Sequence, residues 1–283
     1  MNNWILLVIL VSFFVSFSEV AKKKALKMNS TYEVLTGYTT ISFLIILFFT
    51  KDAFSIDKAY LLIILFKSII VALSWTLAFD ALKELQLSIY GMLKISRILF
   101  TILLGLLVLG ERISIPTVIG MIIVITGLVL VNTTINVDHD KKSSLKVIVY
   151  FLISCFLSSV SAIIDKKILV DISSSQLQFW FYVFLTVYFW ILLLVKQKKI
   201  DFKKMKVNYW ILIIAVFVTA SDRFLFVANE NPSSKASIIV ILKQLSVVIS
   251  IFLGKFIFKE KDTIKKLLYS FLIILGLIIM FIF

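Results

Sequence analysis

Two apolar stretches of the chain contain cations at positions where a membrane protein rarely tolerates them. The first, Tyr90 to Arg112, reads YGMLKISRILFTILLGLLVLGER and contains Lys94 and Arg97 one helical turn apart. The second reads VILKQLSVVISIFLGKFIFKEK and places Lys243 149 residues after Lys94. A Lys or Arg at the bilayer centre costs about 2.5–3.5 kcal/mol on insertion scales, so such residues normally face a bundle interior or a water-filled cavity. The alternative is a structural role, in which helix carbonyls, acids or the membrane surface satisfy both lysines.

Helical spacing groups the polar residues of each stretch on one helix face, because residues three and four apart are neighbours. The first stripe consists of Tyr90, Lys94, Arg97, Thr101 and Gly105. The second consists of Lys243, Ser246, Ser250 and Gly254, each 149 residues after a member of the first. We expect the two stripes to line one cavity, in which the cations bind an anion through charge-assisted hydrogen bonds.

The third and eighth apolar runs supply further candidate binding residues. Lys67 and Trp75 lie in the third run, and Asp222 and Arg223 lie deep in the eighth. We expect Asp222 to be the only acid well inside the membrane and to pair with Arg223 or a lysine, with proton coupling as the alternative. Five cations against one acid leave the predicted cavity positive, which favours an anionic solute.

The composition identifies a membrane protein. Of 283 residues, 61% are apolar and 16% are charged, and the mean hydropathy is +1.07, whereas soluble domains are about 45–50% apolar. The net charge of +14 comes mostly from residues that flank apolar runs, which predicts contact with membrane surfaces and not with nucleic acid. Glu19, beside Lys22, is interpreted as part of a surface ion pair. A single Cys and a single His exclude a disulfide within the chain and a cysteine-based metal site, and we expect no cofactor.

The apolar residues form ten runs, and a helix needs about 20 residues to span the hydrocarbon core. The sequence therefore predicts an all-α membrane protein with ten transmembrane helices. The predicted spans are 4–21, 34–50, 59–79, 87–109, 113–132, 146–164, 176–195, 208–228, 236–258 and 266–283. The first run lacks the basic start and cleavage site of a signal peptide, so we expect it to be retained as a helix.

The two halves of the chain are related in sequence. A shift of 143 residues superposes SFSEVAKKKAL on SVSAIIDKKIL, which relates the first span to the sixth. A shift of 149 relates spans four and five to nine and ten, with Lys94, Gly105 and Glu111 matched to Lys243, Gly254 and Glu260. Because five crossings reverse the direction of entry, we expect a 5+5 inverted repeat around a central cavity. The predicted boundaries are 1–135 for the first repeat, 136–147 for a linker loop and 148–283 for the second repeat.

Each predicted repeat has a lysine at the end of its first helix, and in the first repeat the fourth helix closes on LGER before the glycine-containing helix GMIIVITGLVLVN. This pattern resembles the EamA family of the drug/metabolite transporter (DMT) superfamily over essentially the whole chain, although the second copy reads FKEK, with Lys259 in place of the motif's glycine. The resemblance implies alternating access through a central cavity. Lys94 and Lys243 also resemble the symmetry-related lysines that contact the anionic part of the substrate in triose-phosphate translocators and nucleotide-sugar transporters.

These features predict a secondary transporter, not an enzyme, that moves a small organic, anionic solute with proton or counter-solute coupling. One alternative is a membrane-embedded protein or enzyme that handles phosphorylated lipid head groups, although its acid/base pair and metal ligands are not evident. Another is an exporter of cationic drugs, which should contain more membrane acids than bases. We expect a multi-pass protein of a bacterial plasma membrane. The orientation stays open, because loop charges place both termini outside whereas the family resemblance implies cytoplasmic termini.

Overall fold

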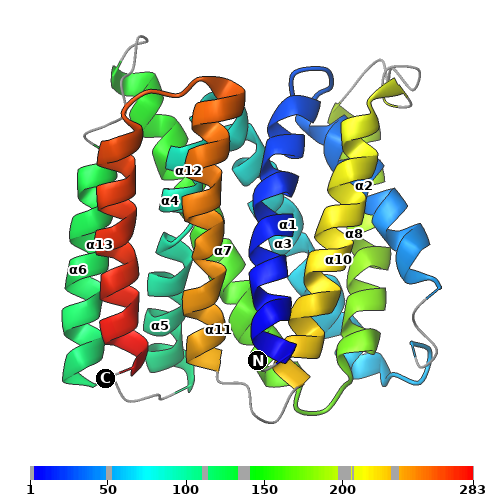
Figure 1. The fold of residues 1–283 in the computed structure, drawn as a ribbon. Helices are drawn as coiled ribbons and strands as arrows, with labels where there is room; N and C mark the ends of the chain where they lie inside the picture. Colours follow the sequence, from blue (N-terminus) through cyan, green and yellow to red (C-terminus); the bar gives the residue numbers. More distant parts are fainter. Residues whose placement is uncertain are drawn as a thin grey trace.

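The protein is a bundle of α-helices (Figure 1). The computed structural model describes residues 3–48, 53–109, 114–132, 141–196, 205, 207–230 and 236–282. The helices in these ranges are α1 (Asn3–Ala25), α2 (Thr31–Ile46), α3 (Lys58–Glu84), α4 (Leu87–Leu93), α5 (Ser96–Leu109), α6 (Ile115–Asn132), α7 (Lys141–Ile168), α8 (Ser174–Lys196), α10 (Tyr209–Glu230), α11 (Ala236–Lys243), α12 (Leu245–Phe258) and α13 (Thr263–Ile282). They occupy the ten predicted spans, since α4 with α5 and α11 with α12 each form one interrupted span. The all-α prediction is confirmed.

Several helices are long and apolar enough to cross a membrane. Within the described ranges, seven segments meet this condition, and Ile115–Val131 in α6 is a shorter apolar helix. The start of α1 and the end of α13 lie at the same end of the bundle (Figure 1). An even number of crossings requires this arrangement.

Local sequence signals explain where individual helices begin and end. Ser30 caps α2 in a capping box, in which its hydroxyl accepts from the Glu33 N–H and its own N–H donates to the Glu33 carboxylate. The Asp57 carboxylate accepts from the Ala59 N–H at the start of α3. Lys259 ends α12 in the left-handed conformation with φ of 56°, so the chain turns there although the motif's glycine is missing.

Small residues allow two of the outer helices to approach closely. A Cβ atom added to Gly120 of α6 would lie only 2.5 Å from the carbonyl oxygen of Gly276 in α13. One added to Gly127 would lie 2.5 Å from the Ile273 side chain. This backbone contact is typical of helix pairs in membranes, where close van der Waals packing replaces the hydrophobic driving force.

Two of the predicted spans are interrupted part-way along their length. The break between α4 and α5 is visible in Figure 1, and the single residue Gln244 separates α11 from α12. Lys94 caps the end of α4, and the Arg97 N–H donates to the Lys94 carbonyl, three residues back, at 3.2 Å. Lys243 is the last residue of α11, and the Gln244 N–H donates to the Ile241 carbonyl at 3.0 Å. The predicted spans 87–109 and 236–258 are therefore each built from two helices, a division that the sequence analysis did not predict. Both interruptions fall at the two repeat-related lysines.

Candidate functional site

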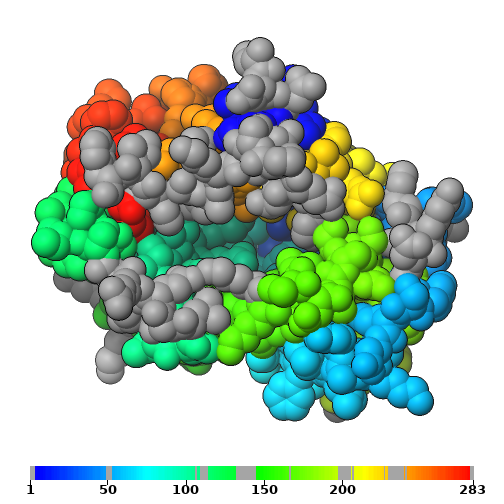
Figure 2. Space-filling model, turned by 90° about the horizontal axis from the view of Figure 1, so that it is seen from below, coloured from blue at the N-terminus to red at the C-terminus, as the bar shows by residue number. Residues whose placement is uncertain are grey.

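A cavity of about 700 Å³, a size suited to a small molecule, is lined by residues of α1, α2, α3, α4, α5, α7, α10, α11 and α12. Figure 2 shows the molecule from the end where the two termini lie, and the surface is hollowed there between α7 and α1, with α5 at its floor. The cavity is lined by the predicted residues Trp75, Tyr90, Lys94, Arg97, Asp222, Lys243 and Ser246, and also by Glu19, Lys22, Tyr38, Phe151, Cys155 and Ala162. Both predicted stripes therefore contribute to one cavity.

The helix interruptions position the three predicted anion-binding cations. Lys94 and Lys243 stand at the carboxyl ends of α4 and α11, where the helix dipole favours a positive charge. The Lys94 side chain is 40% exposed. Arg97, in the first turn of α5, is exposed and lines the same cavity. Within the described ranges, neither Arg97 nor Lys243 forms an ion pair.

Serines on neighbouring helices lie within hydrogen-bond distance of backbone carbonyls next to the interruptions. The Ser159 hydroxyl of α7 donates to the Arg97 carbonyl at 2.8 Å. The Ser16 hydroxyl of α1 donates to the Ser246 carbonyl at 2.9 Å. Ser16 corresponds to Ser159 at the shift of 143 residues, and Arg97 corresponds to Ser246 at the shift of 149. The two contacts are thus equivalent in the sequence repeats.

Glu19 lies inside the protein, so its interpretation as part of a surface ion pair was wrong. Its side chain is 2% exposed, and its Oε1 atom lies 2.6 Å from the Lys94 Nζ atom. Its Oε2 atom accepts from the Ser250 hydroxyl at 3.2 Å. The sequence placed Glu19 next to Lys22 along the chain, whereas packing brings it to a lysine 75 residues away.

Asp222 lines the cavity but has a different partner from the one predicted. The Tyr182 hydroxyl of α8 donates to the Asp222 Oδ2 atom at 3.2 Å. Among the described side chains, Asp222 forms no direct ion pair with Arg223 or with a lysine, but the Lys243 ammonium interacts with it electrostatically. Glu19 also lines the cavity, so Asp222 is not the only acid there.

Aromatic side chains form part of the cavity wall. Tyr90 is 5% exposed, and its ring centroid lies 4.5 Å from that of Phe151. Trp75 packs against Tyr38 with a centroid separation of 5.7 Å. These contacts hold both predicted residues in place next to the cations.

Comparison with known proteins identifies the family of the chain. A model of the EamA-like transporter family matches residues 2–133 and again residues 145–282. The chain belongs to the EamA-like transporter family. This family is part of the DMT superfamily, so the resemblance seen in the sequence is confirmed. A search of curated proteins finds no match.

Two predicted residues of this EamA-like protein lie outside the cavity wall. Lys67 is 4% exposed, forms an ion pair with Asp165 of α7, and lies 4.2 Å from the Phe181 ring centroid. Arg223 is exposed and does not line the cavity. Asp165 is a further acid within a span that sequence reasoning missed, since its partner is on another helix.

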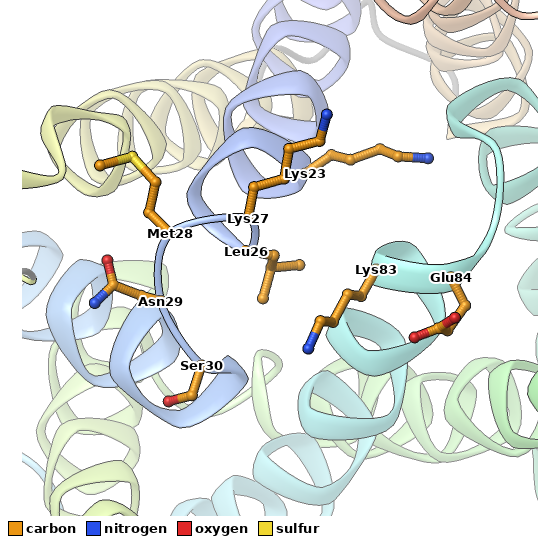
Figure 3. A pocket seen from close by; sticks show the side chains of 8 residues that line it. All are labelled: Lys23, Leu26, Lys27, Met28, Asn29, Ser30, Lys83 and Glu84. Carbon is orange, nitrogen blue, oxygen red and sulfur yellow. The ribbon is translucent and has the colours of Figure 1, made fainter. Parts of the chain in front are cut away.

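A second, smaller pocket lies at the other end of the EamA-like bundle. It has a volume of about 480 Å³ and lies where α1 and α3 end (Figure 3). Lys23, Lys27, Lys83 and Glu84 contribute its charged groups, and the Lys23 ammonium donates to the Leu85 carbonyl. Lysines at span ends commonly anchor a protein at the membrane surface. Within the described ranges, no group of three His, Cys, Asp or Glu residues could hold a metal ion.

Proposed function

We propose that this protein is a secondary transporter that moves a small organic anion by exposing its central cavity alternately to the two sides of the membrane. The observation that carries the proposal is the meeting of Lys94, Arg97 and Lys243 in one cavity, at two helix interruptions. A charged group that faces lipid inside a membrane is costly, so charged groups at this depth often mark a solute pathway. Helices interrupted near mid-depth are also a common way to build transporter sites.

Equivalent contacts in the two halves support an inverted repeat, with units 1–135 and 148–283. The hydrogen bond from Ser16 to the Ser246 carbonyl and the one from Ser159 to the Arg97 carbonyl join corresponding positions. A chain of five crossings per unit brings such positions together only if the units have opposite orientations. In such an architecture, rocking of one half against the other opens each end of the cavity in turn.

The end of the bundle away from the termini is held closed by Glu260. Its carboxylate accepts from the Leu87 N–H at 2.5 Å and from the Ser88 N–H and hydroxyl at the start of α4. The Lys266 ammonium lies 3.3 Å from the same carboxylate. Gly254 leaves the necessary space, because a Cβ atom there would lie 2.6 Å from a Glu260 oxygen. These contacts join α4 to the segment between α12 and α13, and they must break when this end opens.

Transport by the purified protein in liposomes tests the proposal. Radiolabelled carboxylates, phosphate esters, amines and neutral metabolites are compared, and we expect an anion to be taken up unchanged. Lys94→Gln and Lys243→Gln should each reduce its transport by more than about tenfold, since loss of one charge-assisted contact costs about 1.5–3 kcal/mol. The matched control is Lys265→Gln, because the Lys265 side chain is 65% exposed.

Undiminished anion transport by both cavity variants would contradict the proposed binding role of the lysines. Preferred transport of amines would favour the drug exporter. Conversion of a phosphorylated lipid by the same liposomes would favour the enzyme. In each case the expression level in membranes serves as the control for folding.

A further inference from the structure

The Glu19 carboxylate is an anion built into the cavity. One of its oxygens lies 2.6 Å from the Lys94 ammonium, and the other accepts from the Ser250 hydroxyl. The lysine nevertheless remains 40% exposed. An ammonium group has three hydrogens to donate, so Lys94 can bind Glu19 and a solute at once. The carboxylate thus reduces the positive charge that a solute meets without blocking the lysine.

The second half of the protein lacks a corresponding acid. At the shift of 143 residues, Glu19 corresponds to Ala162, and Ala162 also lines the cavity. Lys243 therefore occupies the equivalent interruption without a carboxylate from α7, and it has no ion pair among the residues that the structure describes. The acid whose charge acts on Lys243 is Asp222 of α10, which forms no ion pair with it. The direct contact between Glu19 and Lys94 therefore has no counterpart at Lys243 among the described residues.

The charges on the cavity wall determine the charge that a bound solute has to supply. The cations are Lys22, Lys94, Arg97 and Lys243, and the acids are Glu19 and Asp222. With all six ionised, the wall has an excess of two positive charges. An excess of one sign of charge on a cavity wall attracts solutes of the opposite charge, so a solute with two negative charges fits this wall best.

We propose that Glu19 is a specificity-determining residue that sets the net charge of the transported anion, and that the unaltered cavity selects a dianion. This inference rests on the proposed function. A Glu19→Gln substitution keeps the shape of the side chain and its ability to accept a hydrogen bond from Lys94. It raises the excess of positive charges on the cavity wall from two to three. An Ala162→Glu substitution adds a carboxylate at the corresponding place and lowers the excess to one.

The test compares three carboxylates of similar size at a pH where all their carboxyl groups are ionised. Butanoate, succinate and propane-1,2,3-tricarboxylate supply one, two and three charges. Their dissociation constants for the purified full-length protein are measured by calorimetry. We expect the wild-type protein to bind succinate most tightly. Glu19→Gln should raise the affinity for the tricarboxylate relative to succinate by about tenfold, which corresponds to about 1.4 kcal/mol. Ala162→Glu should shift the preference toward butanoate by a similar factor.

Lys265→Gln is the matched control, because it removes a charge from a side chain that is 65% exposed and outside the cavity wall, and its affinity ratios should equal those of the wild type. Absence of binding of all three carboxylates to the wild-type protein would overturn this inference, whereas the proposed anion transporter would be contradicted only if phosphate esters were also not transported. Succinate binding with unchanged ratios in both charge variants would leave the anion site intact and overturn the role of Glu19. If Glu19→Gln does not fold, the ratio of the dissociation constants of Ala162→Glu for butanoate and succinate decides alone.

Discussion

Ser159 on α7 donates a hydrogen bond of 2.8 Å to the carbonyl oxygen of Arg97, at the interruption between α4 and α5. We expect Ser159→Ala to lower the thermal stability of the protein modestly, because the part-buried Arg97 carbonyl loses one hydrogen bond, worth about 0.5–1.5 kcal/mol, and keeps the one from the Thr101 hydroxyl. Ser16→Ala should have a similar effect at the other interruption. Thermal unfolding of the detergent-solubilised protein measures both.

Thr126→Ala provides the control for these two variants. The Thr126 hydroxyl bonds a carbonyl of its own helix, that of Ile122, on an exposed face, so little stability should be lost. Equal effects of all three substitutions would show that the serines do not specifically support the interruptions.

Glu260→Gln tests the contacts that close one end of the cavity. The substitution removes the charge that binds the amino end of α4 and the Lys266 ammonium, and Lys266 is itself 1% exposed. We expect a loss of about 3–5 kcal/mol in the free energy of unfolding, as for other broken buried ion pairs. Denaturant unfolding should show this loss, whereas Glu84→Gln at the exposed end of α3 should be nearly neutral. A stable Glu260→Gln protein would refute the closing role.

Cys155 offers a natural reporter of access to the cavity. It is the only cysteine, lines the cavity and is 4% exposed. A membrane-impermeant maleimide should label it slowly, and from the side where the termini lie. At a solute concentration of about ten times Kd, the rate should fall about tenfold, because labelling follows the unoccupied fraction. Cys155→Ser gives the blank, and labelling that bound solute does not slow would contradict a solute site next to this residue.

The ion pair between Lys67 and Asp165 should be structural. Lys67→Met leaves the Asp165 carboxylate without its partner, which should destabilise the protein by about 3–5 kcal/mol. The double variant Lys67→Met with Asp165→Asn should recover part of this loss, since no unpaired charge remains. Solute affinity should stay unchanged in the double variant, because neither side chain lines the cavity. Reduced affinity with full stability would instead assign Lys67 to the solute pathway.

The sequence predicted a large part of the cavity wall because the signals are local. Cations in apolar runs mark the helices that line an interior, and spacing of three and four marks the face, so Tyr90, Lys94 and Arg97 were found together. The shift of 149 residues added Lys243 and Ser246. Lys67 carried the same local signal as Lys94, and the sequence did not distinguish a lysine in a cavity from one paired inside a helix interface.

By itself, the sequence determined the ten helical segments, the family and the two repeat-related lysines. The length of the hydrophobic runs reflects the thickness of the membrane, and the spacing of the polar residues reflects the geometry of the helix. Neither depends on how the helices pack. Only the tertiary structure decided that α4 and α11 end at these lysines, that Glu19 binds Lys94, and that Lys67 belongs to Asp165. Each of these features depends on which helix faces meet. That outcome is set by the packing and hydrogen bonding of segments far apart in the chain, as with Ser159 and the Arg97 carbonyl.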